Sequence, residues 1–243
     1  MTKLLSIGAD AKTIKGNKKG FITAIQYLSP YTDSGVNLCA NAKNAECYIA
    51  CLKSAGRMGM AFDARLNRTK LYLNDQAEYF RQLTKEITAF IKKASKKGLT
   101  PLIRLNGTSD IRWENIGFYS EGVYYRNIME VFPDIQFYDY TKLPNREKSI
   151  NGIQSFPENY DLTFSYSGAE GYKKFNDRAL KDGKRVAVVF DRLENIPVVF
   201  EGRRVISGDD TDVRHLDPKN TIVALYAKGK ARKDQTGFVV KCK

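Results

Sequence analysis

The sequence predicts an α/β protein built as a partial or complete parallel β/α barrel with a short C-terminal β extension. Strand-like and helix-like segments alternate along most of the 243 residues, which is typical of a parallel sheet covered by helices. The segment RVAVVF at 185–190 has no polar face, as expected of a strand buried on both sides. We expect a single α/β domain over 1–243, with a cysteine-containing segment at about 30–60 and the β extension at about 196–243.

The clearest predicted element is a helix at 75–97, because apolar residues recur there at helical spacing and Gly98 follows as a stop signal. The remaining elements are identified by apolar runs between turn residues. In chain order they are a strand within 101–107, a helix at 124–132, strands at 135–142 and 162–167, a helix at 170–180, a strand at 185–190, a hairpin at 197–206, and closing strands at 221–229 and 237–241.

Polar segments follow three of these strands, at 106–110, 139–142 and 165–168. The carboxyl ends of parallel strands meet at one edge of a sheet, where barrel and open-sheet enzymes place their sites. Each segment alone has the Gly, Ser, Asp and Asn content of an ordinary tight turn. Three of them on one edge, together with the cysteines, favour a functional site.

Three of the four cysteines, Cys39, Cys47 and Cys51, lie at C-x7-C-x3-C spacing. If residues 47–51 are helical, Cys47 and Cys51 share one face and can bind one metal or cluster. A structural zinc site usually has four ligands in paired C-x2-C motifs, which this chain lacks. Three thiolates instead suit a 4Fe-4S cluster with one iron open to a ligand. Cys242 is either incidental or a fourth ligand.

Several sequence blocks resemble one known family. They are CANAKNAECYIACLKSAGR, ARLNRTKLYLND, PLIRLNGTSDIRWE, FPDIQFYDYTKLPNR, SGDDTDVRHLDP and AKGKARKDQTGFVV. Together they are similar to the phage "gene product eighty-eight" family of mobile genetic elements. That family in turn looks like a distant relative of the radical S-adenosylmethionine-type barrels, whose cysteines have C-x3-C-x2-C spacing.

The resemblance implies an iron–sulfur phage protein, radical S-adenosylmethionine-like, that acts on nucleic acid or a nucleotide-related substrate. It implies a role for each of three residue groups. Cys39, Cys47 and Cys51 would hold the cluster; Asn106, Ser109 and Asp110 would bind S-adenosylmethionine; and Asp139, Tyr140 and Lys142 would face the substrate. Arg104 and Arg112 either share this site or pair with neighbouring acids.

Two other functions remain open. Asp209, Asp210, Asp212 and Asp217 surround the only histidine, His215, and such a cluster can hold Mg²⁺ or Mn²⁺ in a nuclease. The same residues suit a turn whose aspartates bond local amides and pair with Arg203, Arg204 and Arg214. The third reading is a non-enzymatic module, stabilised by a cluster or zinc, that binds nucleic acid.

The charge of the chain points to a polyanionic partner. Forty Lys and Arg against 27 Asp and Glu give a net charge of +13, so we expect at least nonspecific binding to nucleic acid. The first 16 residues lack the apolar core of a secretory signal, and no apolar run is long enough to span a membrane. We therefore expect a cytoplasmic protein without a membrane partner.

Overall fold

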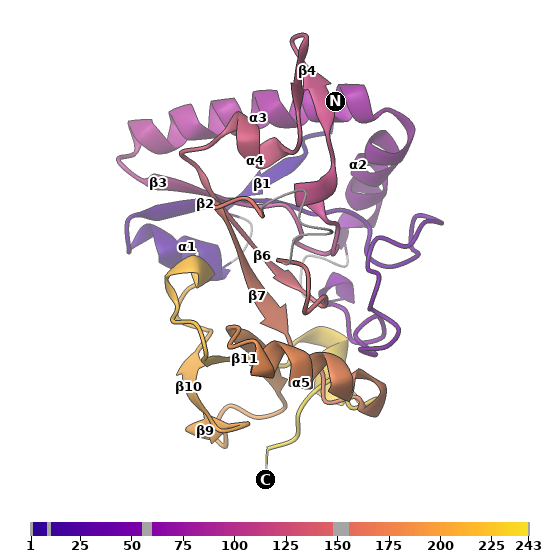
Figure 1. Ribbon diagram of the computed structural model, residues 1–243, viewed down its shortest axis with the longest axis vertical. Helices are drawn as coiled ribbons and strands as arrows, with labels where there is room; N and C mark the ends of the chain where they lie inside the picture. Colours follow the sequence, from indigo (N-terminus) through magenta and orange to yellow (C-terminus); the bar gives the residue numbers. More distant parts are fainter. Residues whose placement is uncertain (1, 9–10, 55–59, 148–155, 243) are drawn as a thin grey trace.

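A computed structural model (Figure 1) describes residues 2–8, 11–54, 60–147 and 156–242 of the chain. Within these residues a nine-stranded sheet has the order β1-β2-β3-β6-β7-β8-β11-β10-β9. Its strands are β1 (Leu5–Ile7), β2 (Phe21–Gln26), β3 (Thr100–Arg104), β6 (Gln136–Thr141), β7 (Tyr160–Ser165), β8 (Val186–Phe190), β9 (Val199–Phe200), β10 (Arg203–Ser207) and β11 (Ile222–Tyr226). The seven inner strands are parallel, whereas β1 and β9 pair antiparallel to their neighbours.

The predicted barrel is wrong, because the sheet is open. Its edges are β1 and β9, which do not pair with each other in the described part of the chain. Closing a barrel requires the strands to tilt and stagger until the first meets the last, and a sequence pattern does not report that geometry. The predicted C-terminal extension is also corrected, since β10 and β11 lie inside the main sheet, parallel to β8. Residues 237–241 contribute only an isolated bridge between Val240 and Phe190.

The helices are α1 (Ala11–Asn17), α2 (Phe62–Asn74), α3 (Gln76–Lys96), α4 (Ile128–Val131) and α5 (Lys173–Lys181). Short 3-10 helices are η1 (Leu52–Ser54), η3 (Trp113–Asn115), η4 (Glu170–Tyr172), η5 (Arg214–Leu216) and η6 (Gly229–Lys233). None of the helices in these described stretches is long and apolar enough to cross a membrane. In Figure 1 α3 runs across the top of the view, while α5 and the yellow C-terminal segment lie near the bottom.

Helix α3 confirms the prediction at 75–97 to within a residue at each end. The Asp75 side chain caps it by accepting a hydrogen bond from the Glu78 amide (3.0 Å), and Gly98 follows with a φ of +62°. Its apolar face packs on the sheet. This core includes Phe80, Leu83, Ile87 and Phe90 from the helix and Ile22, Ala24, Ile103 and Phe137 from the strands, all buried.

The helix predicted at 124–132 is mostly a different structure. Residues Phe118–Ser120 and Val123–Tyr125 form an antiparallel hairpin, β4–β5, which projects at the top of Figure 1. Helix α4 begins only at Ile128, where the Asn127 side chain accepts a hydrogen bond from the Glu130 amide (3.1 Å). The Asn127 cap therefore makes the helix begin four residues later than the apolar spacing of the sequence indicated.

Candidate functional site

An irregular stretch at 29–54, here called the cysteine segment, follows β2 and carries Cys39, Cys47 and Cys51. It lies against the carboxyl edge of the parallel strands, because each of the three predicted loops makes a hydrogen bond to it. These bonds join the Asp110 amide to the Leu38 carbonyl (2.9 Å), the Asn41 side-chain amide to the Lys142 carbonyl (3.0 Å), and the Ser167 hydroxyl to the Ala45 carbonyl (2.7 Å). The predicted gathering of loops and cysteines at one edge is confirmed.

The cysteines lie in turns and irregular structure, and the sulfurs of Cys39 and Cys47 contact backbone amide and carbonyl groups. Residues 41–50 form turns, so the helical arrangement considered for Cys47 and Cys51 does not occur. The Cys39 sulfur accepts a hydrogen bond from the Tyr31 amide (3.3 Å) and lies 3.7 Å from the Thr108 carbonyl oxygen. The Cys47 thiol donates to the Ala42 carbonyl (3.7 Å). All four cysteines of the chain are free thiols.

The three thiols lie close enough for their charges to affect one another's pKa values. The pKa of Cys39 is raised to about 12, mainly by burial and in part by the charges of Asp110, Cys51 and Cys47, while the hydrogen bond from the Tyr31 amide lowers it. Burial also raises the pKa of Cys47 and of Cys51. Metal-free thiols at this edge therefore stay protonated near neutral pH, and a ligand that binds them as thiolates must release protons.

Two buried cations lie beside these thiols. Burial raises the pKa of Cys47, and the charge of Lys142 partly offsets this. Burial lowers the pKa of the Arg65 guanidinium on α2, and the charge of Cys51 partly offsets that. The Lys142 ammonium donates to the carbonyls of Ser165 (3.0 Å) and Tyr166 (2.9 Å). Among the described residues it has no carboxylate at ion-pair distance, and burial lowers its pKa to about 8. The site therefore offers positive charge to an anionic group.

The donor set consists of soft sulfur ligands, which both zinc sites and iron–sulfur clusters take in proteins. Tetrahedral zinc, with Zn–S bonds of about 2.3 Å, holds its sulfurs about 3.8 Å apart. Within the described ranges, no group of three His, Cys, Asp or Glu side chains is placed to hold a metal ion. Cys39, Cys47 and Cys51 are three half-buried free thiols within electrostatic reach of one another, and would be the residues to hold an iron–sulfur cluster.

The three residues expected to bind S-adenosylmethionine are engaged by other groups of the protein. The Asn106 side-chain oxygen accepts from the Ser109 hydroxyl (2.9 Å), the Ile111 amide (2.9 Å) and the Trp113 indole (3.1 Å). Asp110 accepts from the Lys142 amide (2.8 Å) and pairs with Arg146 (3.0 Å). These buried groups are therefore satisfied within the protein, and their geometry is that of a scaffold beneath the cysteine segment.

The three residues expected to face a substrate point in different directions. Asp139 is buried and accepts from the Leu105 and Asn106 amides (3.2 and 2.9 Å) and the Tyr160 hydroxyl (2.9 Å). Burial raises its pKa to about 6. Tyr140 follows Asp139 in β6 and therefore points to the other face of the sheet. Its hydroxyl lies 3.1 Å from Asp212. Only Lys142 faces the cysteines.

The acidic cluster near the C-terminus is divided between separate ion pairs. Asp212 is buried and pairs with Arg104 (2.6 Å), whose guanidinium also lies over the Tyr140 ring. Asp217 pairs with Arg214 (2.8 Å). His215 makes an edge contact with the Phe21 ring, and burial lowers its pKa. Of the pairs predicted for this turn, Asp217–Arg214 occurs, whereas Asp212 pairs instead with the distant Arg104, which thus acts as the partner of an acid. No group of three His, Cys, Asp or Glu side chains in the described residues is placed to hold a metal ion. Arg112 is exposed.

Two buried arginines close to the candidate site were not identified from the sequence. Arg146 binds Asp110, both carboxylate oxygens of Glu114 (2.8 and 2.7 Å) and the Tyr160 hydroxyl (2.9 Å). Arg65 lies on the buried face of α2. Arg146 has no signature in a single sequence, because its partners Glu114 and Asp110 lie 32 and 36 residues away.

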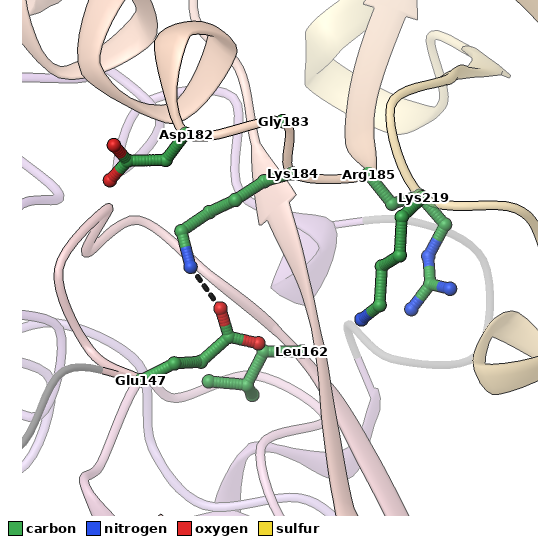
Figure 2. A pocket seen from close by; sticks show the side chains of 7 residues that line it. All are labelled: Glu147, Leu162, Asp182, Gly183, Lys184, Arg185 and Lys219. Atoms are coloured by element: carbon green, nitrogen blue, oxygen red, sulfur yellow. Dashed lines mark hydrogen bonds and ion pairs between the residues drawn. The ribbon is translucent and has the colours of Figure 1, made fainter.

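A pocket of about 210 Å³ lies near the start of β8, at the amino-terminal ends of the parallel strands and so away from the cysteines (Figure 2). Figure 2 shows Lys184 paired with Glu147 across it. Its other two cations, Arg185 and Lys219, both pair with Asp161. Because its cations are already paired with carboxylates, this pocket offers less to a ligand than the cysteine edge.

A model of the family described as gene product 88 matches residues 3–242. Neither the curated proteins nor the solved structures gave a match. The matched range includes the cysteine segment, the three loops at the carboxyl edge and the C-terminal strands, so the resemblance noted in separate sequence blocks extends over nearly the whole chain. The chain therefore belongs to the phage gene product 88 family.

Proposed function

We propose that this chain is an iron–sulfur protein in which Cys39, Cys47 and Cys51 hold a 4Fe-4S cluster. The observation that carries the proposal is the placement of three half-buried free thiols, from one segment, within electrostatic reach of one another. Soft thiolates are the ligands that iron–sulfur clusters take in proteins. The cluster would lie at the carboxyl edge of a parallel sheet, where α/β proteins commonly place their ligands.

The surrounding charges support this assignment. An iron–sulfur core bound by three thiolates is anionic, and burying an anion is costly unless cations lie nearby. Lys142 and Arg65 meet that requirement, one beside Cys47 and the other beside Cys51. The Tyr31 amide also donates to the Cys39 sulfur, which stabilises a thiolate more than a thiol.

Three cysteines leave one iron without a protein ligand, because Cys242 is engaged elsewhere. Its amide donates to Asp191 (2.8 Å) and its thiol lies 3.7 Å from the Arg192 carbonyl oxygen, beyond the end of β8. We propose that the open iron binds S-adenosylmethionine and that the substrate is nucleic acid or a related nucleotide. When bound, such a cluster supplies one-electron chemistry. The chain's own residues orient the thiolates, balance their charge and cover one side of them.

The cluster is tested by anaerobic purification with iron, sulfide and zinc quantification. We expect brown protein with a broad absorbance near ~400 nm and iron and sulfide in equal amounts. Replacing Cys39, Cys47 and Cys51 together by serine should abolish both the colour and the iron. Cys242→Ser is the matched control and should leave them unchanged. Stoichiometric zinc without iron or sulfide would show that the site is a zinc centre and refute the proposal.

The S-adenosylmethionine assignment has a separate test. Calorimetry on cluster-loaded protein should detect binding of S-adenosylmethionine, and the triple cysteine variant should show none. Absence of binding to the loaded protein would refute the cofactor assignment while leaving the cluster in place.

A further inference from the structure

The 3-10 helix η6 lies directly against the cysteine segment. Ala231 of η6 and the nearby Ala227 and Phe238 form one buried cluster with Ala50, and Cys47 packs against it. The Lys230 amide also donates to the Ser54 hydroxyl (3.4 Å). One side of η6 is therefore fixed to the stretch that carries the cysteines.

The other side of η6 presents only positive charge. Lys228, Lys230, Arg232 and Lys233, here called the basic turn, are all exposed. None of the four makes an ion pair with another residue of the described chain.

The nearest acid along the chain does not neutralise this charge. Asp234 is buried, and its carboxylate accepts from the Thr236 hydroxyl (2.7 Å) and the Val239 amide (3.0 Å). It is thus turned inward, away from the four cations. Arg232 also has an aromatic support, because its guanidinium lies 5.4 Å from the centre of the Tyr226 ring.

We propose that the basic turn binds the phosphate backbone of a nucleic acid and holds it beside the cysteine edge of the sheet. The inference deepens the proposed function, on which it rests for the chemistry at that edge, by naming a phosphodiester chain as the ligand. Four unpaired cations within six residues match a polyanion whose charges repeat along a chain. A membrane surface is the poorer match, because interfacial segments need an exposed apolar face and Ala231 is buried.

The chain contains a matched control for this proposal. Lys92, Lys93, Lys96 and Lys97 are also four exposed cations within six residues. They lie at the end of α3, just before β3 begins, and so at the edge of the sheet opposite to the cysteines. Replacing either set by glutamine removes the same charge from a different place.

The experiment measures the affinity of the full-length protein for a labelled DNA duplex and for its single strand, by fluorescence anisotropy at about 50 to 200 mM salt. Glutamine at all four positions of the basic turn should weaken binding at low salt by about tenfold or more. It should also reduce the slope of log affinity against log salt by up to about 3.6 on the duplex, or about 0.9 for each lost phosphate contact. The α3 variant should stay within about twofold of the unmodified protein, because its lysines lie outside the proposed site.

The inference is overturned if the unmodified protein does not bind nucleic acid at low salt, or if the basic-turn variant binds as tightly as the unmodified protein. It is also overturned if both variants weaken binding equally. A last contrary result is that the basic turn is needed for binding to phosphatidylglycerol vesicles but not for binding to nucleic acid. A second variant with only Lys230 and Lys233 changed checks the result if the fourfold variant folds poorly, and should give about half the change in slope. Iron and sulfide are quantified in every sample. Protein that lacks a cluster but binds through the basic turn refutes the proposed function and leaves this inference standing.

Discussion

Asp110→Ala should lower the free energy of unfolding of the metal-free protein by about 3 kcal/mol. The side chain accepts hydrogen bonds from two buried donors, the Lys142 amide (2.8 Å) and the Arg146 guanidinium (3.0 Å). Each donor left without a partner costs about 1–3 kcal/mol. The loss stays near the lower end of the range for a broken buried ion pair, about 3–5 kcal/mol, because Glu114 still binds Arg146 through both oxygens.

The assay is urea unfolding followed by circular dichroism, with Asp134→Ala as the control. Asp134 is exposed, so its replacement should change the free energy by less than about 0.5 kcal/mol. In a thermal scan, about 3 kcal/mol corresponds to a midpoint lower by about 6–12 °C for a chain of this size. If Asp110→Ala is as stable as the control and instead loses only S-adenosylmethionine binding in the loaded protein, the scaffold role argued here for the 106–110 loop is wrong.

Asp212→Ala should cost about 3–5 kcal/mol in urea unfolding, because Arg104 would keep only Asp139, at 3.9 Å, as an acidic partner; a loss below about 1 kcal/mol would contradict this. Gly168→Ala should cost about 1–3 kcal/mol and lower the iron content, since its Cβ would lie 2.7 Å from the Gly237 carbonyl oxygen; unchanged melting and iron would refute the contact. Alkylation of the cysteines of the metal-free protein by iodoacetamide should keep accelerating up to about pH 10, because raised pKa values, about 12 for Cys39, keep the thiols protonated at lower pH; a rate that levels off at about pH 8 would argue against protonated thiols.

The sequence was sufficient for features that depend on local pattern. Helix α3 was found because its apolar face repeats over 21 residues, and β8 because it has no polar face. The position of the candidate site at the carboxyl ends of the strands could be predicted from topology alone. If strands are parallel, the loops after them meet at one edge whatever the overall closure of the sheet, so the wrong barrel prediction did not displace the loops at 106–110, 139–142 and 165–168.

The roles of individual polar residues could not be predicted in the same way. A polar side chain in a loop can face a ligand or satisfy the loop's own backbone, and the two have the same sequence signature. Asn106 illustrates the second case, with three donors from its own loop on one oxygen. Asp212 is similar, because its partner Arg104 lies 108 residues away and nothing local indicates the pair.

Lys142 connects these observations, because its backbone and its side chain serve different parts of the edge. Its amide donates to Asp110 and its carbonyl accepts from Asn41 and from the Tyr172 hydroxyl, so the end of β6 is fixed to the 106–110 loop and to the cysteine segment. Its ammonium is held by two carbonyls of the next loop. Carbonyls bind an ammonium without neutralising it, so the full charge remains beside Cys47. A buried lysine left in this state is costly on its own, and an anionic cluster on the neighbouring thiolates would offset that cost.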